Sequence, residues 1–300
     1  MKRVLITGAN GFIGRHGLPL LAARGYEVHA VYLKGDKVNG AQAHWHQADL
    51  LDSSKVSQLI LKVRPTHLLH LAWFATPGEF WNSPENLRWV QSSLGLLQDF
   101  AINGGQRVVM AGSCAEYDWS DGYCQEGVTP LTPATLYGAS KHALQCILDA
   151  FAPQAKISAA WGRVFFLYGP HEHPDRLVSY VARSLLRREP AHCSHGKQVR
   201  DFLYVEDVAD AFVTLLDSDV SGPVNIASGE AITLKEVIFK VADLLDGHSL
   251  VQLDSVPPGE NEPELVVANV DRLVKDVGWS PSWGLERGLN ETISWWKAHL

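Results

Sequence analysis

The stretch Thr7-Gly8-Ala9-Asn10-Gly11-Phe12-Ile13-Gly14 decides the fold. It directly follows an apolar run at residues 4–6 and opens a helix-like stretch over residues 12–24. Glycines at this spacing let a buried strand turn sharply into a helix whose first N–H groups face outward. Such a helix start binds a pyrophosphate through backbone donors and the positive end of the helix dipole. Because strand, turn and helix occur in the required order, the stretch predicts a dinucleotide-binding fold.

The composition is typical of a globular protein. The chain has 300 residues, of which 46% are hydrophobic and 20% charged, enough for one or two domains. A net charge of -7 without a long basic run argues against nucleic acid or an anionic membrane as a partner. No apolar stretch approaches the roughly 20 residues that span a bilayer, and the N-terminus lacks a signal-peptide profile. Four cysteines without a CxxC pair favour free thiols and a cytoplasmic location.

The thirteen histidines do not show the spacing of a metal site. His44 and His46 alternate along a strand-like run, and His192 and His195 lie in a loop without a carboxylate at useful spacing. We therefore expect solvated or core histidines and no bound metal.

Short apolar runs alternate with amphipathic segments through the first half of the chain. We expect strands at residues 3–7, 27–32, 43–47, 67–71, 107–111 and 157–166, and helices at 12–24, 53–63, 84–103 and 135–151. This alternation predicts an α/β fold, a Rossmann doubly wound parallel sheet with a smaller C-terminal substrate-binding lobe. We expect the dinucleotide-binding domain at residues 1–166, with a segment at about 199–218 returning to it, and the smaller lobe at 167–300.

Three polar residues form a candidate catalytic group. Tyr137 and Lys141 are four residues apart at the start of a predicted helix, so they share one helix face. A lysine in that place is expected to lower the pKa of the phenol, so that Tyr137 can exchange the proton that accompanies hydride transfer. Ser113 follows the strand at 107–111 and therefore lies at the ligand edge of the sheet. Its hydroxyl can bond the substrate oxygen as charge develops there.

With these elements the chain resembles the extended short-chain dehydrogenase/reductase family, in its nucleotide-sugar epimerase, dehydratase and reductase branch. Residues 7–14 match the TGxxGxxG loop, Asp49-Leu50 match the acidic–apolar pair near the adenine, and His70-Leu71-Ala72 match the strand end beside the cofactor. Ser113 and Tyr117 match the Ser-x-x-x-Tyr segment. The runs RVFFLYGP at 163–170 and RDFLYVEDV at 200–208 match two further segments, so the resemblance extends almost end to end.

The resemblance implies roles for two sets of residues. The implied cofactor-binding residues are Gly8, Asn10, Gly11, Phe12, Ile13, Gly14, Tyr32, Lys34, Asp49, Leu50, Leu71, Ala72, Tyr137 and Lys141. The implied substrate-binding residues are Trp73, Cys114, Ala115, Phe166, Arg176 and Arg200, with Arg200 in the place of the arginine that contacts the substrate diphosphate. A second basic residue for the diphosphate is missing from the loop at 256–260. The resemblance also implies a homodimer through the helices at 84–103 and 135–151.

The cofactor is expected to be NADP(H) rather than NAD(H). Tyr32 stands where many NAD-dependent members have an aspartate that binds the ribose hydroxyls and repels a 2′-phosphate. Lys34, Lys37 and Arg15 are close in sequence and add positive charge. Asp36 is the residue that could restore a preference for NAD.

The choice of reaction depends on the residues that follow Ser113. Sugar 4,6-dehydratases of this family have an Asp-Glu pair where this chain has Cys114 and Ala115, and a 3,5-epimerising cysteine would also stand at 115. Reduction and 4-epimerisation remain. Trp89 and Phe166 replace asparagines, so the pocket is more apolar and favours reduction of a nucleotide-linked 4-keto-6-deoxy sugar, with Tyr137 as proton donor.

The alternatives are a nucleotide-sugar 4-epimerase with tightly held NAD, a reductase of a non-sugar ketone, and a non-catalytic dinucleotide-binding module. All but the last would use Ser113, Tyr137 and Lys141.

Overall fold

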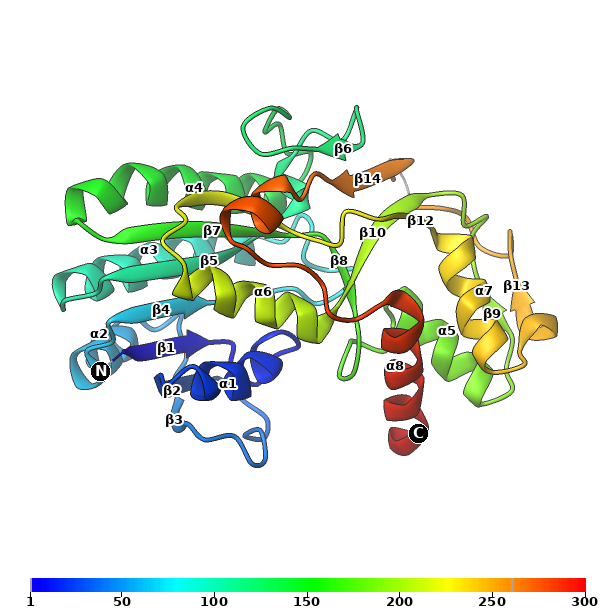
Figure 1. The fold of residues 1–300 in the computed structure, drawn as a ribbon, viewed down its shortest axis with the longest axis horizontal. Coiled ribbons are helices and arrows are strands. Elements are labelled where there is room, and N and C mark those ends of the chain that lie inside the picture. The colour runs from blue at the N-terminus through cyan, green and yellow to red at the C-terminus, as the bar shows by residue number, and fades with distance from the viewer. Residues whose placement is uncertain (1, 260–261) are drawn as a thin grey trace.

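A parallel sheet forms the centre of the molecule (Figure 1). The computed structural model describes residues 2–259 and 262–300. The seven strands lie in the order β11-β7-β5-β4-β1-β2-β3. Their bounds are β1 Arg3–Thr7, β2 Glu27–Tyr32, β3 His44–Gln47, β4 His67–His70, β5 Arg107–Ser113, β7 Ser158–Val164 and β11 Gly222–Ile226. The order reverses between β1 and β4, so the crevice at the carboxyl ends of these strands is where such sheets bind ligands.

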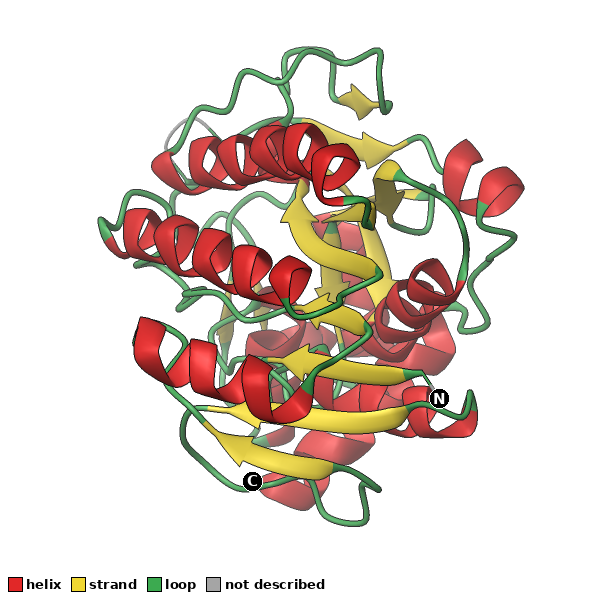
Figure 2. Ribbon diagram, turned by 90° about the vertical axis from the view of Figure 1, so that its left-hand side faces the viewer, coloured by secondary structure: helices red, strands yellow, loops and turns green. Residues whose placement is uncertain are grey.

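Helices cover both faces of this sheet (Figure 2). Helices α1 (Gly14–Ala23) and α6 (Val205–Asp217) pack on one face, and α2 (Ser53–Val63), α3 (Glu85–Ile102) and α4 (Leu136–Ala155) pack on the other. Strand β1 shows the consequence, because Val4 and Ile6 contact the first layer and Leu5 the second. Strands buried on both sides read as continuous apolar runs, and this arrangement confirms the predicted α/β class.

A second lobe lies beyond the carboxyl end of the large sheet (Figure 1). Its sheet contains β6 (Tyr123–Cys124), β8 (Phe166–Tyr168), β10 (Val199–Tyr204), β12 (Ala231–Thr233) and β14 (Leu265–Ala268). The lobe's helices are α5 (Leu177–Leu186), α7 (Leu234–Leu244) and α8 (Leu285–His299), with a two-stranded sheet of β9 (Ala191–His192) and β13 (Val251–Gln252). A short helical turn at His248–Leu250 lies in this lobe, whereas the turn at Arg272–Asp276 packs against β11 of the large sheet.

Strand pairing shows where the chain passes between the two sheets. Residues 199–218 were expected to return to the first domain, but β10 pairs with β8, β12 and β14 of the second lobe. The return begins with α6, which packs against α1, and continues into β11, which pairs with β7.

The two helices expected at a dimer interface are mostly committed to the chain's own core. Leu97, Leu144 and Leu148 are buried against the sheet, whereas Leu87 and Ile147 are 58% and 43% exposed. The homodimer therefore stays a prediction. Among the described residues, none of the helices has the length and apolar character to cross a bilayer.

Candidate active site

The glycine-rich loop between β1 and α1 forms an anion cradle. Gly8 has a φ of +65°, and a Cβ there would lie 3.0 Å from the backbone nitrogen of Ala72. A Cβ on Gly14 would overlap the carbonyl oxygen of Gly8. Helix α1 starts without a side-chain cap and without an acidic residue in its first turn. Its first N–H groups are therefore available to a pyrophosphate, and the cradle fits a dinucleotide.

Two side chains hold this loop in place. The Asn10 amide donates hydrogen bonds to the carbonyl oxygens of Lys34, at 2.8 Å, and Asp36, at 3.3 Å. The Arg15 guanidinium donates to the carbonyl oxygens of Asn10, at 2.7 Å, and Gly11, at 3.3 Å. The glycine loop is thus tied to the loop that follows β2, next to Tyr32. Phe12 and Ile13 lie partly buried in the same turn.

The ends of β1 and β4 are joined by a buried polar chain. The Thr7 hydroxyl accepts hydrogen bonds from the backbone N–H groups of Leu71, at 3.1 Å, and Ala72, at 3.2 Å. It also lies 2.7 Å from His70 Nδ1, and His70 Nε2 lies 2.9 Å from the Ser93 hydroxyl. Burial lowers the pKa of His70 to about 3, so its imidazole is neutral. These bonds fix the predicted cofactor edge at Leu71 and Ala72.

The residues predicted to lie near the adenine make fewer contacts with one another than those at the ends of β1 and β4. The Asp49 carboxylate accepts a bond from the Leu51 N–H at 2.9 Å, so it caps its own turn, and Leu50 is buried beside it. The Tyr32 ring lies edge-on to Trp45, with 5.7 Å between centroids. Lys34 is exposed.

The structure brings Ser113, Tyr137 and Lys141 together at the end of β5. The Lys141 Nζ donates to the carbonyl oxygen of Ala111, at 2.8 Å. The Ser113 side chain lowers the pKa of Tyr137 by favouring its ionised form, against the larger effect of burial. Helix α4 starts at this place because the Thr135 hydroxyl caps Gly138 N–H at 3.2 Å, and Gly138 lies so close to the Ala115 carbonyl that a Cβ would overlap it. The three predicted catalytic side chains thus come from one strand end and one helix start.

The electrostatics of this group differ from the expectation. Lys141 was expected to lower the pKa of Tyr137, but burial raises the pKa of Tyr137 above its ordinary value, opposed by the Ser113 hydrogen bond and the charge of Arg176. Burial also lowers the pKa of Lys141 to about 7. The Lys141 Nζ lies 6.0 Å from the Tyr137 ring centroid but 3.7 Å from that of Trp73. The ammonium therefore contacts a carbonyl and an indole face, and the expectation was wrong for this arrangement.

Aromatic side chains from the loop after β4 enclose Tyr137. The ring centroids of Phe80, Trp81 and Trp73 lie 4.8, 5.9 and 6.5 Å from that of Tyr137. The Tyr137 N–H donates to the Trp81 carbonyl at 2.9 Å, and the Trp73 Nε1 donates to Asn86 Oδ1 at 2.9 Å. Phe80 and Trp81 were not predicted as site residues, because they lie in a loop whose sequence shows no helical or strand periodicity.

A buried ion pair supports Ser113 from behind. Glu116, in the turn Cys114–Glu116, accepts bonds from the Ser113 N–H at 2.7 Å, Trp161 Nε1 at 2.9 Å and Arg163 Nε at 2.8 Å. Glu116 and Arg163 are 0% and 1% exposed. Sequence reasoning missed Glu116, although a serine followed three residues later by glutamate is a capping-box signal.

The second lobe brings basic and apolar residues toward the site. The Arg176 guanidinium lies 5.7 Å from the Phe80 centroid, and the Arg200 guanidinium lies 5.2 Å from that of Phe166. Arg200 is 2% exposed, and its Nη2 pairs with Glu262 Oε1 at 3.0 Å. Glu262 follows the loop at 256–260, where a second basic residue for the diphosphate is missing, and it supplies a carboxylate to Arg200. Glu260 of that loop lies outside the described residues.

The other predicted substrate residues follow Ser113 directly. Cys114 and Ala115 are buried, and burial raises the pKa of the Cys114 thiol, which makes it a poor nucleophile or base.

Known proteins resemble this chain over its full length. The solved structure of MoeE5 in complex with UDP-glucuronic acid and NAD is 31% identical and covers 99% of this chain and 100% of its own, with a TM-score of 0.86. The UDP-glucose 4-epimerase of Thermus thermophilus in complex with NAD is 27% identical, with 99% and 100% covered and a TM-score of 0.86. UDP-glucuronic acid decarboxylase 1 of Danio rerio is 28% identical over 100% of this chain and 73% of the relative.

The expectation of NADP(H) is wrong, because these solved neighbours hold NAD. The structure shows why the positive charges near Tyr32 did not indicate the cofactor correctly. The Arg15 guanidinium is occupied by the carbonyls of the glycine loop, and Lys34 and Lys37 are exposed beside the equally exposed Asp36. Solvated charges of both signs select weakly between the two cofactors.

The family itself follows from these findings. The glycine cradle, the Ser113–Tyr137–Lys141 group and the parallel sheet agree with a family model described as "NAD dependent epimerase/dehydratase family", which matches residues 4–227. The chain belongs to the NAD-dependent epimerase/dehydratase family of extended short-chain dehydrogenases/reductases.

Proposed function

We propose that this protein is an NAD-dependent nucleotide-sugar 4-epimerase. The observation that carries the proposal is the composition of the group at the end of β5. With bound NAD as hydride carrier, Ser113, Tyr137 and Lys141 suffice for the movement of one proton, and the two residues after Ser113 are a buried cysteine and an alanine. The cradle at Gly8, where a Cβ would crowd Ala72, fits the dinucleotide.

The chain's own residues move the proton and hold the substrate oxygen. Bound NAD supplies the hydride acceptor and donor. In its phenolate form Tyr137 would accept the proton of the sugar 4-hydroxyl and return it to the same oxygen, and Ser113 would bond that oxygen while its charge changes. Lys141, with its pKa near 7, takes either protonation state close to neutral pH.

The surroundings favour epimerisation over elimination of water. Elimination needs a second acid or base to move a proton on the sugar ring, but burial raises the pKa of the Cys114 thiol and Ala115 is apolar. The Glu116 carboxylate already accepts bonds from Ser113, Trp161 and Arg163. Arg176 and Arg200 are the candidates for binding the diphosphate of the substrate.

Reduction of a 4-keto-6-deoxy sugar is the second candidate. It would use the same catalytic groups, and the apolar walls support it, since Trp73 and Trp89 lie 6.0 Å apart between ring centroids. The two reactions differ in the fate of the cofactor. An epimerase retains NAD through turnover, whereas a reductase exchanges NADH at every turnover.

The test therefore begins with the cofactor. The purified protein is denatured, and released nucleotide is identified by mass spectrometry. We expect NAD close to one per chain, and conversion of UDP-glucose or UDP-glucuronic acid to the 4-epimer without added cofactor. An empty protein that reduces a 4-keto sugar only with added NADH would replace the epimerase by the reductase.

A variant pair tests the role of Tyr137. Tyr137→Phe should lower kcat by about 10²–10⁴-fold, because general acid–base catalysis contributes that much. Tyr123→Phe is the matched control, because Tyr123 is 50% exposed and lies on β6 of the second sheet. Equal activity of both variants would refute the catalytic assignment.

A further inference from the structure

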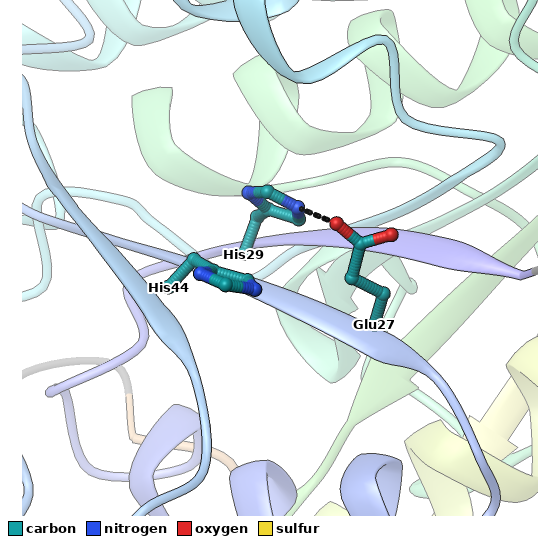
Figure 3. A group of neighbouring side chains, drawn as sticks. All are labelled: Glu27, His29 and His44. Carbon is teal, nitrogen blue, oxygen red and sulfur yellow. Dashed lines mark hydrogen bonds and ion pairs between the residues drawn. The ribbon is translucent and has the colours of Figure 1, made fainter.

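A cluster of nitrogen and oxygen ligands lies on β2 and β3, away from the catalytic group. Glu27, His29 and His44 each present one ligand atom, and these atoms lie within 4.8 Å of one another (Figure 3). His29 and His44 are direct partners in the register of the two parallel strands. Glu27 precedes His29 by two residues, so its side chain leaves the same face of the sheet. The register therefore brings His44 of the edge strand to Glu27 and His29 of the neighbouring strand.

We propose that Glu27, His29 and His44 form a binding site for a divalent transition-metal ion of the zinc type. Two imidazoles and a carboxylate are donors that zinc prefers, and three protein ligands leave a fourth position for water. Such an ion would link the edge strand β3 to β2. The site is separate from the proposed epimerase reaction, since Glu27 and His44 are the first residues of their strands and the cofactor cradle is at the other end.

The distances allow an ion with small movements of the side chains. His29 Nε2 lies 3.0 Å from Glu27 Oε1. Two ligands at about 2.1 Å from a tetrahedral zinc ion are about 3.4 Å apart, so this pair needs to open only slightly. The His44 ring stacks on that of His29, with 4.9 Å between centroids. Because His44 is exposed at the sheet edge, its ring is free to rotate toward the ion.

Two further residues orient the ligands from outside. Arg3 Nε binds the other oxygen of Glu27, Oε2, at 3.0 Å, which leaves Oε1 toward His29. His46 Nε2 lies 2.9 Å from His29 Nδ1. Carboxylates and histidines that bind metals commonly have such partners, which fix their orientation and the histidine tautomer.

The contacts of His29 with Glu27 and His46 determine which of its nitrogens is available to an ion. An ionised carboxylate only accepts hydrogen bonds, so His29 Nε2 carries the proton toward Glu27. An ion that replaces this proton leaves His29 protonated at Nδ1, with His46 as acceptor. The exchange is a tautomer shift of two imidazoles and needs no net loss of a proton.

An ion at this place would stiffen the loop between the two strands. Strand β3 ends the large sheet and pairs with β2. The loop between them carries the carbonyl groups of Lys34 and Asp36, which Asn10 of the glycine loop binds. A link between His29 and His44 would tie the edge strand down on one side of that loop.

The test uses protein without a histidine tag, stripped with EDTA and titrated with zinc sulfate against a chromogenic chelator. We expect one saturable zinc ion per chain. His44→Gln should weaken the binding at least ten-fold, because it removes one of three ligands. The matched control is the double variant His142→Gln/Cys146→Ser. These two residues of α4 form the obvious adventitious zinc site, because the Sγ of exposed Cys146 lies 3.6 Å from His142 Nε2. The control should bind zinc as the unmodified chain does.

A second readout separates the site from a folding defect. Zinc should raise the melting temperature of the unmodified protein by a few degrees and leave that of His44→Gln unchanged. Without zinc the two proteins should melt together, because His44 is exposed. Absence of saturable binding, equal binding by His44→Gln, or loss of binding in the His142→Gln/Cys146→Ser control would each overturn the proposal.

Discussion

Replacing Lys141 by methionine should stabilise the protein at neutral pH while removing its activity. Lys141 is 4% exposed, and its ammonium contacts the Ala111 carbonyl and the face of Trp73. No carboxylate forms a salt bridge with it among the described residues. Burial accordingly lowers the pKa of Lys141 from 10.5 to about 7, which means that folding is penalised for carrying this amine.

The size of the penalty follows from the two pKa values of Lys141. The difference between 10.5 and about 7, at about 1.36 kcal/mol per pH unit, amounts to about 5 kcal/mol at pH 7 and below. Methionine avoids this cost but leaves the Ala111 carbonyl without its donor, which costs about 1–3 kcal/mol. We therefore expect Lys141→Met to raise the free energy of unfolding by about 2–4 kcal/mol at pH 7.

The sign of the pH dependence is fixed by proton binding. Between pH 7 and 10.5 the unfolded chain keeps the Lys141 proton and the folded chain releases it, so the stability of the unmodified protein rises with pH through this window. The advantage of Lys141→Met should shrink correspondingly. Urea unfolding of both proteins at pH 6.5 to 9.5 measures this, with exposed Lys240→Met as control. A difference that does not change with pH, or a less stable Lys141→Met at pH 7, would refute the reasoning.

Three further substitutions test other parts of the site. Glu116→Gln leaves the Arg163 charge buried without a counter-ion and should lower the free energy of unfolding by about 3–5 kcal/mol in urea. Gly14→Ala places a methyl group on the Gly8 carbonyl, so the purified protein should lose its bound dinucleotide, measured by absorbance after denaturation. Glu262→Gln removes the carboxylate that pairs with Arg200 and should tighten binding of UDP several-fold by calorimetry, if a diphosphate competes for that guanidinium.

The first two of these variants have a matched control. Glu189→Gln changes an exposed glutamate and should leave the unfolding free energy within about 0.5 kcal/mol. Gly95→Ala adds a methyl group with no atom within 4 Å and should retain the dinucleotide. Unchanged UDP affinity in Glu262→Gln would remove Arg200 from the diphosphate site.

The sequence predicts the parts of the fold that depend on a local pattern of residues. Strands buried on both faces read as apolar runs, and the glycine spacing marks the turn into α1, so the sheet and the cradle were predictable. The run at 157–166 was predicted as one strand, but the structure divides it. Ser158–Val164 pairs with β5 and β11, whereas Phe166–Tyr168 pairs with β10 in the second sheet. The change of sheet has no local signal, because the apolar run at 164–167 continues across the break.

Contacts between distant segments were the part that sequence reasoning missed. The histidines were judged by their spacing along the chain, but His29 and His44 meet through strand register. The pKa of Tyr137 was argued from helix spacing to Lys141 alone, and the indole of Trp73 that attracts the ammonium comes from another loop. Pairings of this kind depend on how elements pack, and a periodic pattern within one element carries no information about them.

The reaction of this site is decided by what its walls permit. Glu116, the carboxylate nearest in sequence to Ser113, is used for support, because it holds the Ser113 backbone and Arg163. The chemistry left to the site is the transfer of one hydride and one proton. A 4-keto sugar is then either reduced or epimerised, and epimerisation requires that it present its other ring face to the cofactor. The rings of Phe80, Trp81 and Trp73 surround Tyr137 with apolar surface, which holds a sugar without fixing the orientation of its hydroxyl groups. The proposed 4-epimerase requires the sugar ring to turn between the two hydride transfers, whereas the alternative reductase does not, so the same apolar walls serve both candidates and the retained cofactor distinguishes them.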